Sequence, residues 1–188
     1  MSDKGKLFVF SAPSGAGKTT IVRSILKVFN ELVFSVSATT RKRRENEVEG
    51  KDYFFISEEE FKRKIENDEF VEWERFYDYY YGTLKTFIDD KIAKGLSVVL
   101  EVDVKGAVRI KENYPESVLI YIAPPSLEEL KERLINRNTE TKEDLEKRIK
   151  RAEMEIGYQD KFDYAVVNND LEHAVEEVKK ILLKEIDK

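Results

Sequence analysis

The sequence contains no cysteine and a single histidine, His173. Without cysteine the chain has no disulfide bond, no thiolate nucleophile and no cysteine-based zinc site, and one histidine is too few for a typical transition-metal centre. Any chemistry must therefore depend on carboxylates, hydroxyls, lysines, arginines and hard cations. We expect His173 on the exposed side of a final helix and assign it no role.

Long apolar runs are absent as well. No stretch approaches the roughly 18 residues needed to cross a bilayer, and the apolar segment that begins at Leu7 is too short for a signal peptide. We therefore expect a cytoplasmic protein that does not contact membranes. The 38 acidic residues outnumber the 33 basic ones, for a net charge of -5, so no general nucleic-acid-binding surface is expected.

What the sequence does contain indicates one α/β domain, since 188 residues with 41% hydrophobic content suffice for one substantial core. Apolar helical spacing over Thr19–Phe29 and Leu171–Ile186 predicts helices. Largely apolar, β-branched runs typical of a parallel sheet buried on both faces occur at Leu7–Phe10, Leu96–Val104, Ser117–Ala123 and Asp163–Asn168. The predicted core is a doubly wound parallel sheet. Two regions, 35–84 and 126–160, interrupt this pattern and are interpreted as mobile flaps.

Between the first strand and first helix lies "SAPSGAGKTT", Ser11 to Thr20. It is close to the phosphate-binding pattern G-x-x-x-x-G-K-[ST], except that Ala12 replaces the first glycine. Glycines let backbone N–H groups face an anion, Lys18 reaches the outer phosphates, and the Thr19 hydroxyl is the expected Mg²⁺ ligand. Alanine is tolerated at position 12 if φ is negative there. We predict a nucleotide-binding P-loop, and a chance glycine-rich turn is the alternative.

The segment "FSVSATTRKRRENEVEGKDYFF" combines hydroxyls with several arginines. Arginine forks and nearby hydroxyls suit a phosphate monoester, which they bind through bidentate hydrogen bonds. The same residues also fit a nucleic-acid-binding patch or a solvated loop. These alternatives stay open at this point.

A third segment, "EFVEWERFYDYYYGTL", contains Glu72 and Thr83. Guanine has N–H donors at N1 and N2 and an acceptor at O6, so a guanine pocket needs a carboxylate with hydroxyl partners. Glu72 with Ser37 and Thr83 supplies that set. The alternative is an ordinary edge strand in which Glu72 faces water and Trp73 and the tyrosines are packing residues.

Taken together, these motifs resemble the guanylate kinase family over essentially the whole chain. The matching segments follow the family's order: "SAPSGAGKTT", "FSVSATTR", "EGKDYFF", "EFVEW", "YYYGT", "VVLEVDVKGA", "ERLINRNTET" and "VVNND". The resemblance implies Mg²⁺-dependent transfer of the γ-phosphoryl group of ATP to GMP. It also implies a single domain, with a P-loop core at about 1–34, 85–125 and 161–188, a mixed α/β GMP-binding region at about 35–84 and a helical lid at about 126–160.

The resemblance further implies roles for individual residues, which group by substrate. ATP would be bound by Ala12, Pro13, Ser14, Gly15, Ala16, Gly17, Lys18, Thr19 and Thr20, with Asn168 near adenine. Mg²⁺ would lie near Thr19 and Glu101. GMP would be bound by Ser37, Arg41, Arg44, Glu47, Tyr53, Glu72, Tyr81, Gly82, Thr83 and Asp103. The catalytic cations would be Lys18, Arg41, Arg133, Arg137 and Arg148.

The chain departs from the family pattern at several glycines and one proline. Arg43 stands where proline is usual and Asn46 where glycine is usual, so the path of this loop is not predicted. Asn136 and Asn138 also replace glycines. Arg133 and Arg137 are four residues apart, which places them on one helical face if the helix continues through Ile135. Alternatively, such arginines pair with glutamates on a solvated helix.

Three other functions compete with this prediction. A non-catalytic module that binds phosphopeptides would not need the Lys18 and Thr19 that are present here. The second is another small kinase, for example one acting on AMP or a pyrimidine nucleotide. Opposite adenine, Glu72 would be a buried acceptor without a donor, at a cost of about 1–3 kcal/mol, which argues against AMP. A regulatory GTPase would need an N-K-x-D segment, which the sequence lacks.

Overall fold

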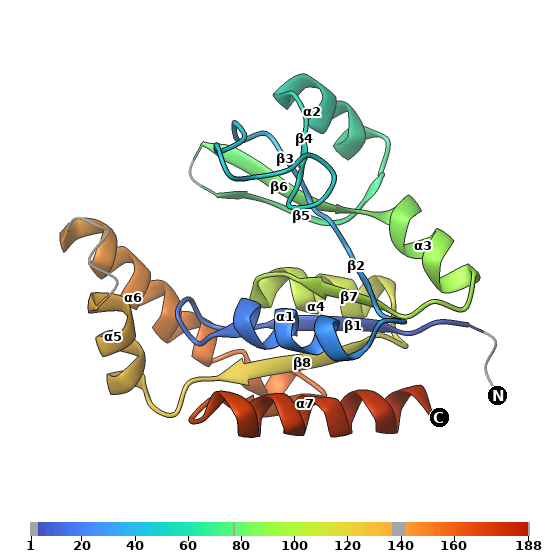
Figure 1. The fold of residues 1–188 in the computed structure, drawn as a ribbon. Coiled ribbons are helices and arrows are strands. Elements are labelled where there is room, and N and C mark those ends of the chain that lie inside the picture. The colour runs from blue at the N-terminus through green and yellow to red at the C-terminus, as the bar shows by residue number, and fades with distance from the viewer. Residues whose placement is uncertain (1–3, 77, 137–141, 188) are drawn as a thin grey trace.

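A parallel sheet forms the centre of the molecule in the computed structural model, which describes residues 4–76, 78–136 and 142–187 (Figure 1). Its strand order is β2-β7-β1-β8-β9, and every neighbouring pair is parallel. The strands are β1 Leu7–Ser11, β2 Val33–Phe34, β7 Val98–Glu101, β8 Val118–Ala123 and β9 Tyr164–Val167. The predicted parallel α/β core is confirmed.

Helices cover both faces of this sheet because successive side chains of a strand point to opposite sides. Phe8 and Phe10 belong to the buried cluster that includes α1 (Lys18–Val28) and α7 (Leu171–Ile186). Leu7 and Val9 belong to the cluster that includes α3 (Lys85–Ala93) and α4 (Val104–Asn113). The sheet is therefore doubly wound, as the apolar runs predict.

Residues 38–84 form a second sheet, which Figure 1 shows above the core. Its order is β4-β3-β6-β5, with strands β3 Ala38–Thr39, β4 Phe54–Phe55, β5 Phe70–Phe76 and β6 Tyr79–Leu84. Helix α2, Glu58–Glu66, packs on it, and its Phe61 ring stacks on that of Phe70 at 4.3 Å. This small, separate cluster of aromatic and aliphatic residues forms the core of the second sheet.

The charged segment 126–160 is mainly helical, as predicted. It forms α5 (Leu127–Ile135) and α6 (Lys142–Ile156), and the 3₁₀ helix η1 (Gln159–Lys161) follows. Leu130 and Leu134 of α5 and Ala152 of α6 join the core cluster beside α1. The two helices are thereby packed next to the loop that precedes α1.

The end of one predicted strand is wrong. The run expected to extend to Val104 stops at Glu101, and α4 begins at Val104. Asp103 causes the change, because its Oδ1 accepts the N–H of Gly106 at 2.7 Å and caps the helix. Val102 and Val104 are nevertheless buried, which explains why the apolar pattern continues.

The last helix was predicted correctly, and His173 is exposed on it. Throughout the described ranges, the helices are too short or too polar to cross a membrane.

Candidate active site

The loop between β1 and α1 has the conformation that its glycines permit. Gly15 and Gly17 both have φ of 92°, and Gly17 is the N-cap of α1. Among the described non-glycine residues only Asp68 has positive φ, so Ala12 has none. Alanine therefore replaces the first glycine of the motif without backbone strain.

Behind this loop lies Asn168, which is almost fully buried. Its Nδ2 donates to the carbonyl of Ala16 at 2.7 Å, and a Cβ at position 17 would lie 2.3 Å from the same nitrogen. Arg133 donates from Nη2 to the Asn168 carbonyl at 3.1 Å and pairs with Glu129. Asn168 and Arg133 thus support the loop from behind.

At the start of α1, Lys18 and Thr19 face Glu101 of β7. The Lys18 Nζ donates to the Val102 carbonyl at 3.0 Å and lies 4.0 Å from a Glu101 oxygen. Burial lowers the pKa of Lys18, and the negative charge of Glu101 opposes this shift. The Thr19 hydroxyl donates to Glu101 at 2.7 Å.

The Thr19 hydroxyl and the Glu101 carboxylate fit Mg²⁺, which prefers oxygen ligands and usually keeps waters and substrate phosphates in its coordination shell. Within the described ranges, no three Asp, Glu or His side chains are arranged to hold a metal by themselves. A metal here would therefore depend on the phosphates of a bound nucleotide.

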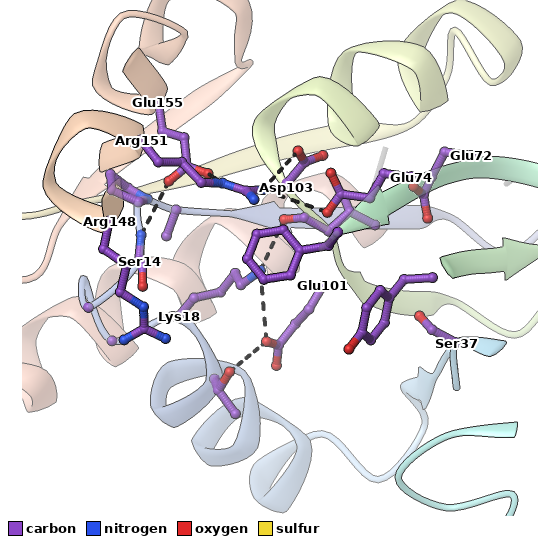
Figure 2. Close-up of a pocket in the computed structure, with 18 of the residues that line it drawn as sticks. Ser14, Lys18, Ser37, Glu72, Glu74, Glu101, Asp103, Arg148, Arg151 and Glu155 are labelled. Atoms are coloured by element: carbon purple, nitrogen blue, oxygen red, sulfur yellow. Dashed lines mark hydrogen bonds and ion pairs between the residues drawn. The ribbon is translucent and has the colours of Figure 1, made fainter. Parts of the chain in front are cut away.

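The loop and the second sheet face each other across one cavity of about 500 Å³ (Figure 2). The loop side consists of Ala12, Pro13, Ser14, Gly15, Gly17, Lys18, Thr19 and Thr20. The second sheet and the crossover before it contribute Ser37, Tyr53, Glu72, Glu74, Phe76, Tyr81 and Gly82. The remaining lining residues are Glu101, Val102, Asp103, Arg148, Arg151 and Glu155. Residues that the sequence assigns to ATP and residues that it assigns to GMP therefore line one cavity, whereas Arg41, Arg44 and Glu47 are not among its lining residues.

Glu72 is a buried carboxylate of this cavity, with 8% of its surface exposed. Although β5 is an edge strand, the alternative in which Glu72 faces water is wrong. Its Oε1 accepts the Thr83 hydroxyl at 2.7 Å, and Thr83 is fully buried. Burial raises the pKa of Glu72 to about 7, and the negative charges of Asp103 and Glu74 contribute in the same direction.

In the loop between β3 and β4, Arg41 and Glu47 form a bidentate pair. Two N–O distances of 3.0 and 2.6 Å join them, and Glu47 also accepts the backbone N–H of Arg44 at 2.8 Å. The hydrogen bonds from Arg41 and Arg44 lower the pKa of Glu47 to about 2. The guanidinium of Arg41 lies 5.5 Å from the Tyr53 ring, and that ring lies 6.0 Å from the Tyr81 ring. The predicted phosphate-binding residues are therefore neighbours.

The unusual residues of the arginine loop cause no backbone strain. Asn46 has no positive φ, so the left-handed conformation that glycine would permit is not used at this position. The side chains of Arg43 and Arg44 are exposed. Arg44 takes part in the cluster through its backbone N–H to Glu47.

The sequence reasoning did not assign roles to Glu74, Arg151 or Glu155, all of which line the cavity. Arg151 and Glu155 are four residues apart on α6, which is the spacing of helix neighbours, and that spacing is the one signal available in the sequence. Arg148 of the same helix also lines the cavity. Arg137 lies outside the described residues.

Comparisons with known proteins identify the family of this chain. The family model described as guanylate kinase matches residues 4–185. Guanylate kinases of Caldanaerobacter subterraneus and Thermotoga maritima are each 50% identical to the chain over 182 residues, which cover 97% of this chain and 88% of each relative. The crystal structure of guanylate kinase from Anaplasma phagocytophilum is 33% identical, with a TM-score of 0.80 over 100% of this chain and 89% of that one. This chain belongs to the guanylate kinase family.

Proposed function

We propose that the protein transfers the γ-phosphoryl group of Mg-ATP to GMP, and to dGMP, giving ADP and the nucleoside diphosphate. One observation carries the proposal: a single cavity contains the P-loop residues Lys18 and Thr19 on one side and a buried carboxylate of the second sheet, Glu72, on the other. Direct transfer requires donor and acceptor to occupy one space from which water can be excluded.

On the donor side, the loop would bind the ATP phosphates through backbone N–H groups at the start of α1. The positive end of the helix favours anions there. The Lys18 ammonium, close to the cavity wall at the Val102 carbonyl, would reach the outer phosphates. When bound between Thr19 and Glu101, Mg²⁺ would neutralise part of the phosphate charge.

On the acceptor side, we assign Glu72 to the N1 and N2 donors of guanine. The Thr83 hydroxyl already occupies one Glu72 oxygen and thereby fixes the orientation of the carboxylate. Ser37 and Asp103 line the same cavity. Arg41 and Arg44, with Tyr53 and Tyr81, would bind the GMP phosphate.

The acceptor needs no general base, because a phosphate monoester with a second pKa near 6 is largely dianionic at neutral pH. A GMP phosphate oxygen attacks the γ-phosphorus of ATP and forms the new O–P bond. The bond from that phosphorus to the β,γ-bridging oxygen breaks, and ADP leaves with the electron pair. The protein's contribution is to hold two mutually repelling anions in line and to neutralise their charge.

The arginines of the helical segment 126–160 supply the remaining positive charge in this proposal. Arg148 already lines the cavity. Arg133 is bound to Glu129 and to the Asn168 carbonyl behind the loop, so it must exchange these partners to reach a phosphate. We therefore infer that the segment acts as a lid that rearranges when both nucleotides are bound. The reaction would take place in the cytoplasm, where ATP is produced and used.

The test is ADP formation by the purified protein with Mg-ATP, with GMP, AMP, UMP or CMP as acceptor. We expect turnover with GMP, and we expect Glu72→Gln to lose at least about tenfold in kcat/KM for GMP, because the variant places an amide opposite the guanine donors. Glu66→Gln, at an exposed position of α2, is the matched control. A folded protein that binds GMP but forms no ADP would contradict the catalytic proposal.

A further inference from the structure

Arg151 of α6 contacts three parts of the molecule that are distant in sequence (Figure 2). Its Nε pairs with Glu155 at 2.8 Å, one turn farther along α6. Its Nη2 lies 3.3 Å from Oδ2 of Asp103 at the start of α4, and 3.6 Å from Oε1 of Glu74 on β5. The guanidinium also lies 4.6 Å from the ring of Phe76 on β5.

Charge explains why a cation is needed at this position. Five carboxylates line the cavity, against three cationic side chains, Lys18, Arg148 and Arg151. Arg151 contacts three of the five carboxylates. Burial and the neighbouring Asp103 raise the pKa of Glu74, whereas Arg151 opposes this shift. Arg151 is therefore a counterion that Asp103 and Glu74 share, and its removal would leave the two carboxylates to repel each other.

We propose that Arg151 is a positioning residue for GMP, which holds Asp103 and Glu74 in place beside the guanine-reading Glu72 and joins the helical segment to the second sheet. The inference rests on the proposed function, in which Asp103 and Glu72 contact guanine. Arg151 has no role among the residues that the family resemblance assigns to ATP, GMP or Mg²⁺.

The contacts of Asp103 support a role in which Arg151 affects GMP binding through Asp103. One oxygen, Oδ1, caps α4 by accepting the Gly106 N–H at 2.7 Å, and the other, Oδ2, faces Arg151. The guanidinium therefore restricts rotation of a carboxylate that the helix cap fixes on one side only. Because Glu74 and Phe76 hold the same guanidinium from β5, the position of Asp103 depends on the second sheet.

Arg151 is also linked to the ATP side through Glu155, which is 3% exposed. Oε2 of Glu155 accepts the backbone N–H of Ser14 in the P-loop at 3.3 Å. Glu155 has its own hydrogen bond to the loop, so loss of Arg151 should affect GMP more than ATP. This difference distinguishes a positioning role from general loss of structure.

The experiment measures the dissociation constants of GMP and of ATP by calorimetry, without turnover, for the wild type, Arg151→Gln, Glu74→Gln and the double variant. We expect Arg151→Gln to weaken GMP binding about tenfold, a size typical of residues in one interaction network, and ATP binding less than about threefold. Arg151→Lys should lie between the wild type and Arg151→Gln, since lysine retains the charge but loses the fork. Lys150→Gln, at an exposed neighbouring position, is the control.

The double variant provides the decisive measurement. If Arg151 acts through its contacts to β5, the effects of Arg151→Gln and Glu74→Gln on GMP binding are not additive. If the effects of the two substitutions on GMP binding are additive, Arg151 does not act through Glu74, and the positioning role is overturned. Equal losses for GMP and ATP, or unchanged GMP binding in Arg151→Gln, would overturn it as well. A wild type that binds ATP but not GMP would overturn the proposed function itself.

Discussion

In the proposed function, the two sides of the cavity recognise phosphate and base by different means. On the ATP side, the recognition groups are mostly backbone N–H groups, made available by two glycines with positive φ, and Lys18 is the one cationic side chain among the loop residues. On the GMP side, recognition would depend on side chains such as Glu72. Its neighbour Thr83 orients the carboxylate through a hydrogen bond, whereas burial and the nearby Asp103 and Glu74 disfavour its negative charge.

This difference predicts different sensitivities to mutation. A phosphate-binding loop made of backbone N–H groups depends on its local conformation. A substitution should therefore disturb it only where a new side chain does not fit, as at Gly17, or where the charge of Lys18 is removed. A site made of side chains depends on a network of hydrogen bonds between segments, so many substitutions weaken it moderately. The following predictions test this contrast, beginning with the largest effect.

Lys18→Ala should reduce kcat by at least about 100-fold, the size expected when a preorganised electrostatic contact is removed from a transition state. Its midpoint of thermal unfolding should change little, because Lys18 makes one hydrogen bond to a backbone carbonyl and its burial disfavours its charge. Single-turnover kinetics and circular dichroism measure both quantities. Lys27→Ala, at an exposed position of the same helix, is the control, and Lys18→Ala with more than a tenth of wild-type kcat would contradict the assignment.

The same contrast explains how much of the site is predictable from sequence. The P-loop is contiguous, and its glycines, lysine and threonine lie within one strand-turn-helix unit, so spacing alone predicts its conformation. Ala12 fits because only the φ of that residue matters, and φ is not positive there. The GMP side has no such local pattern, and the proposed role of Glu72 rests on guanine chemistry together with the family's motifs.

The network around Arg151 was not predictable from sequence, for a physical reason. It joins Ser14, Glu74, Asp103 and α6, four segments that come together only through folding. The end of β7 was missed for a similar reason, because the cap by Asp103 overrides an apolar pattern that continues through Val104. The charged segment 126–160 indicated helix correctly, but which of its arginines face the cavity depends on how α6 packs.

Arg41→Gln should raise KM for GMP about tenfold to 100-fold, the effect expected from lost hydrogen bonds between charged groups, with KM for ATP nearly unchanged. Glu47, which is held ionised by Arg41, would then be left beside the GMP phosphate as an additional repulsive charge. Steady-state kinetics with each substrate varied in turn measure KM for GMP and KM for ATP separately. The exposed Arg43 offers a matched control, since equal effects of Arg43→Gln and Arg41→Gln would indicate a diffuse basic patch.

Gly17→Ala tests the backbone conformation of the phosphate-binding loop without changing its charge. Alanine at φ of 92° costs about 1–2 kcal/mol, and its Cβ would also displace the Asn168 amide from Ala16. We expect weaker ATP binding and an unfolding midpoint lowered by about 2–4 °C per kcal/mol. Ala12→Gly should leave ATP affinity within about twofold, because position 12 has no such constraint, and similar losses in the two variants would contradict this account of the loop.

The smallest effect should be a pH dependence confined to the GMP side. In the proposed function, guanine binding requires ionised Glu72. Burial raises the pKa of Glu72 to about 7; Asp103 and Glu74 act in the same direction, and Thr83 and Arg109 oppose the shift. The ionised fraction therefore falls about tenfold between pH 8 and pH 6, and kcat/KM for GMP should fall with it.

The GMP phosphate also titrates near pH 6, so Glu72→Gln is the necessary comparison: its remaining pH dependence reports the nucleotide alone. The stability of the folded protein should also depend on pH through the raised pKa of Glu72. A carboxyl group whose pKa is higher in the folded state stabilises the fold fully below pH 4.5, and this contribution is lost as the pH rises through 7. Glu72→Gln should accordingly unfold at a higher temperature than the wild type above pH 7, with the difference shrinking as the pH falls towards 5. Identical pH profiles of kcat/KM in the two proteins would exclude Glu72 as the group that reads guanine in its ionised form.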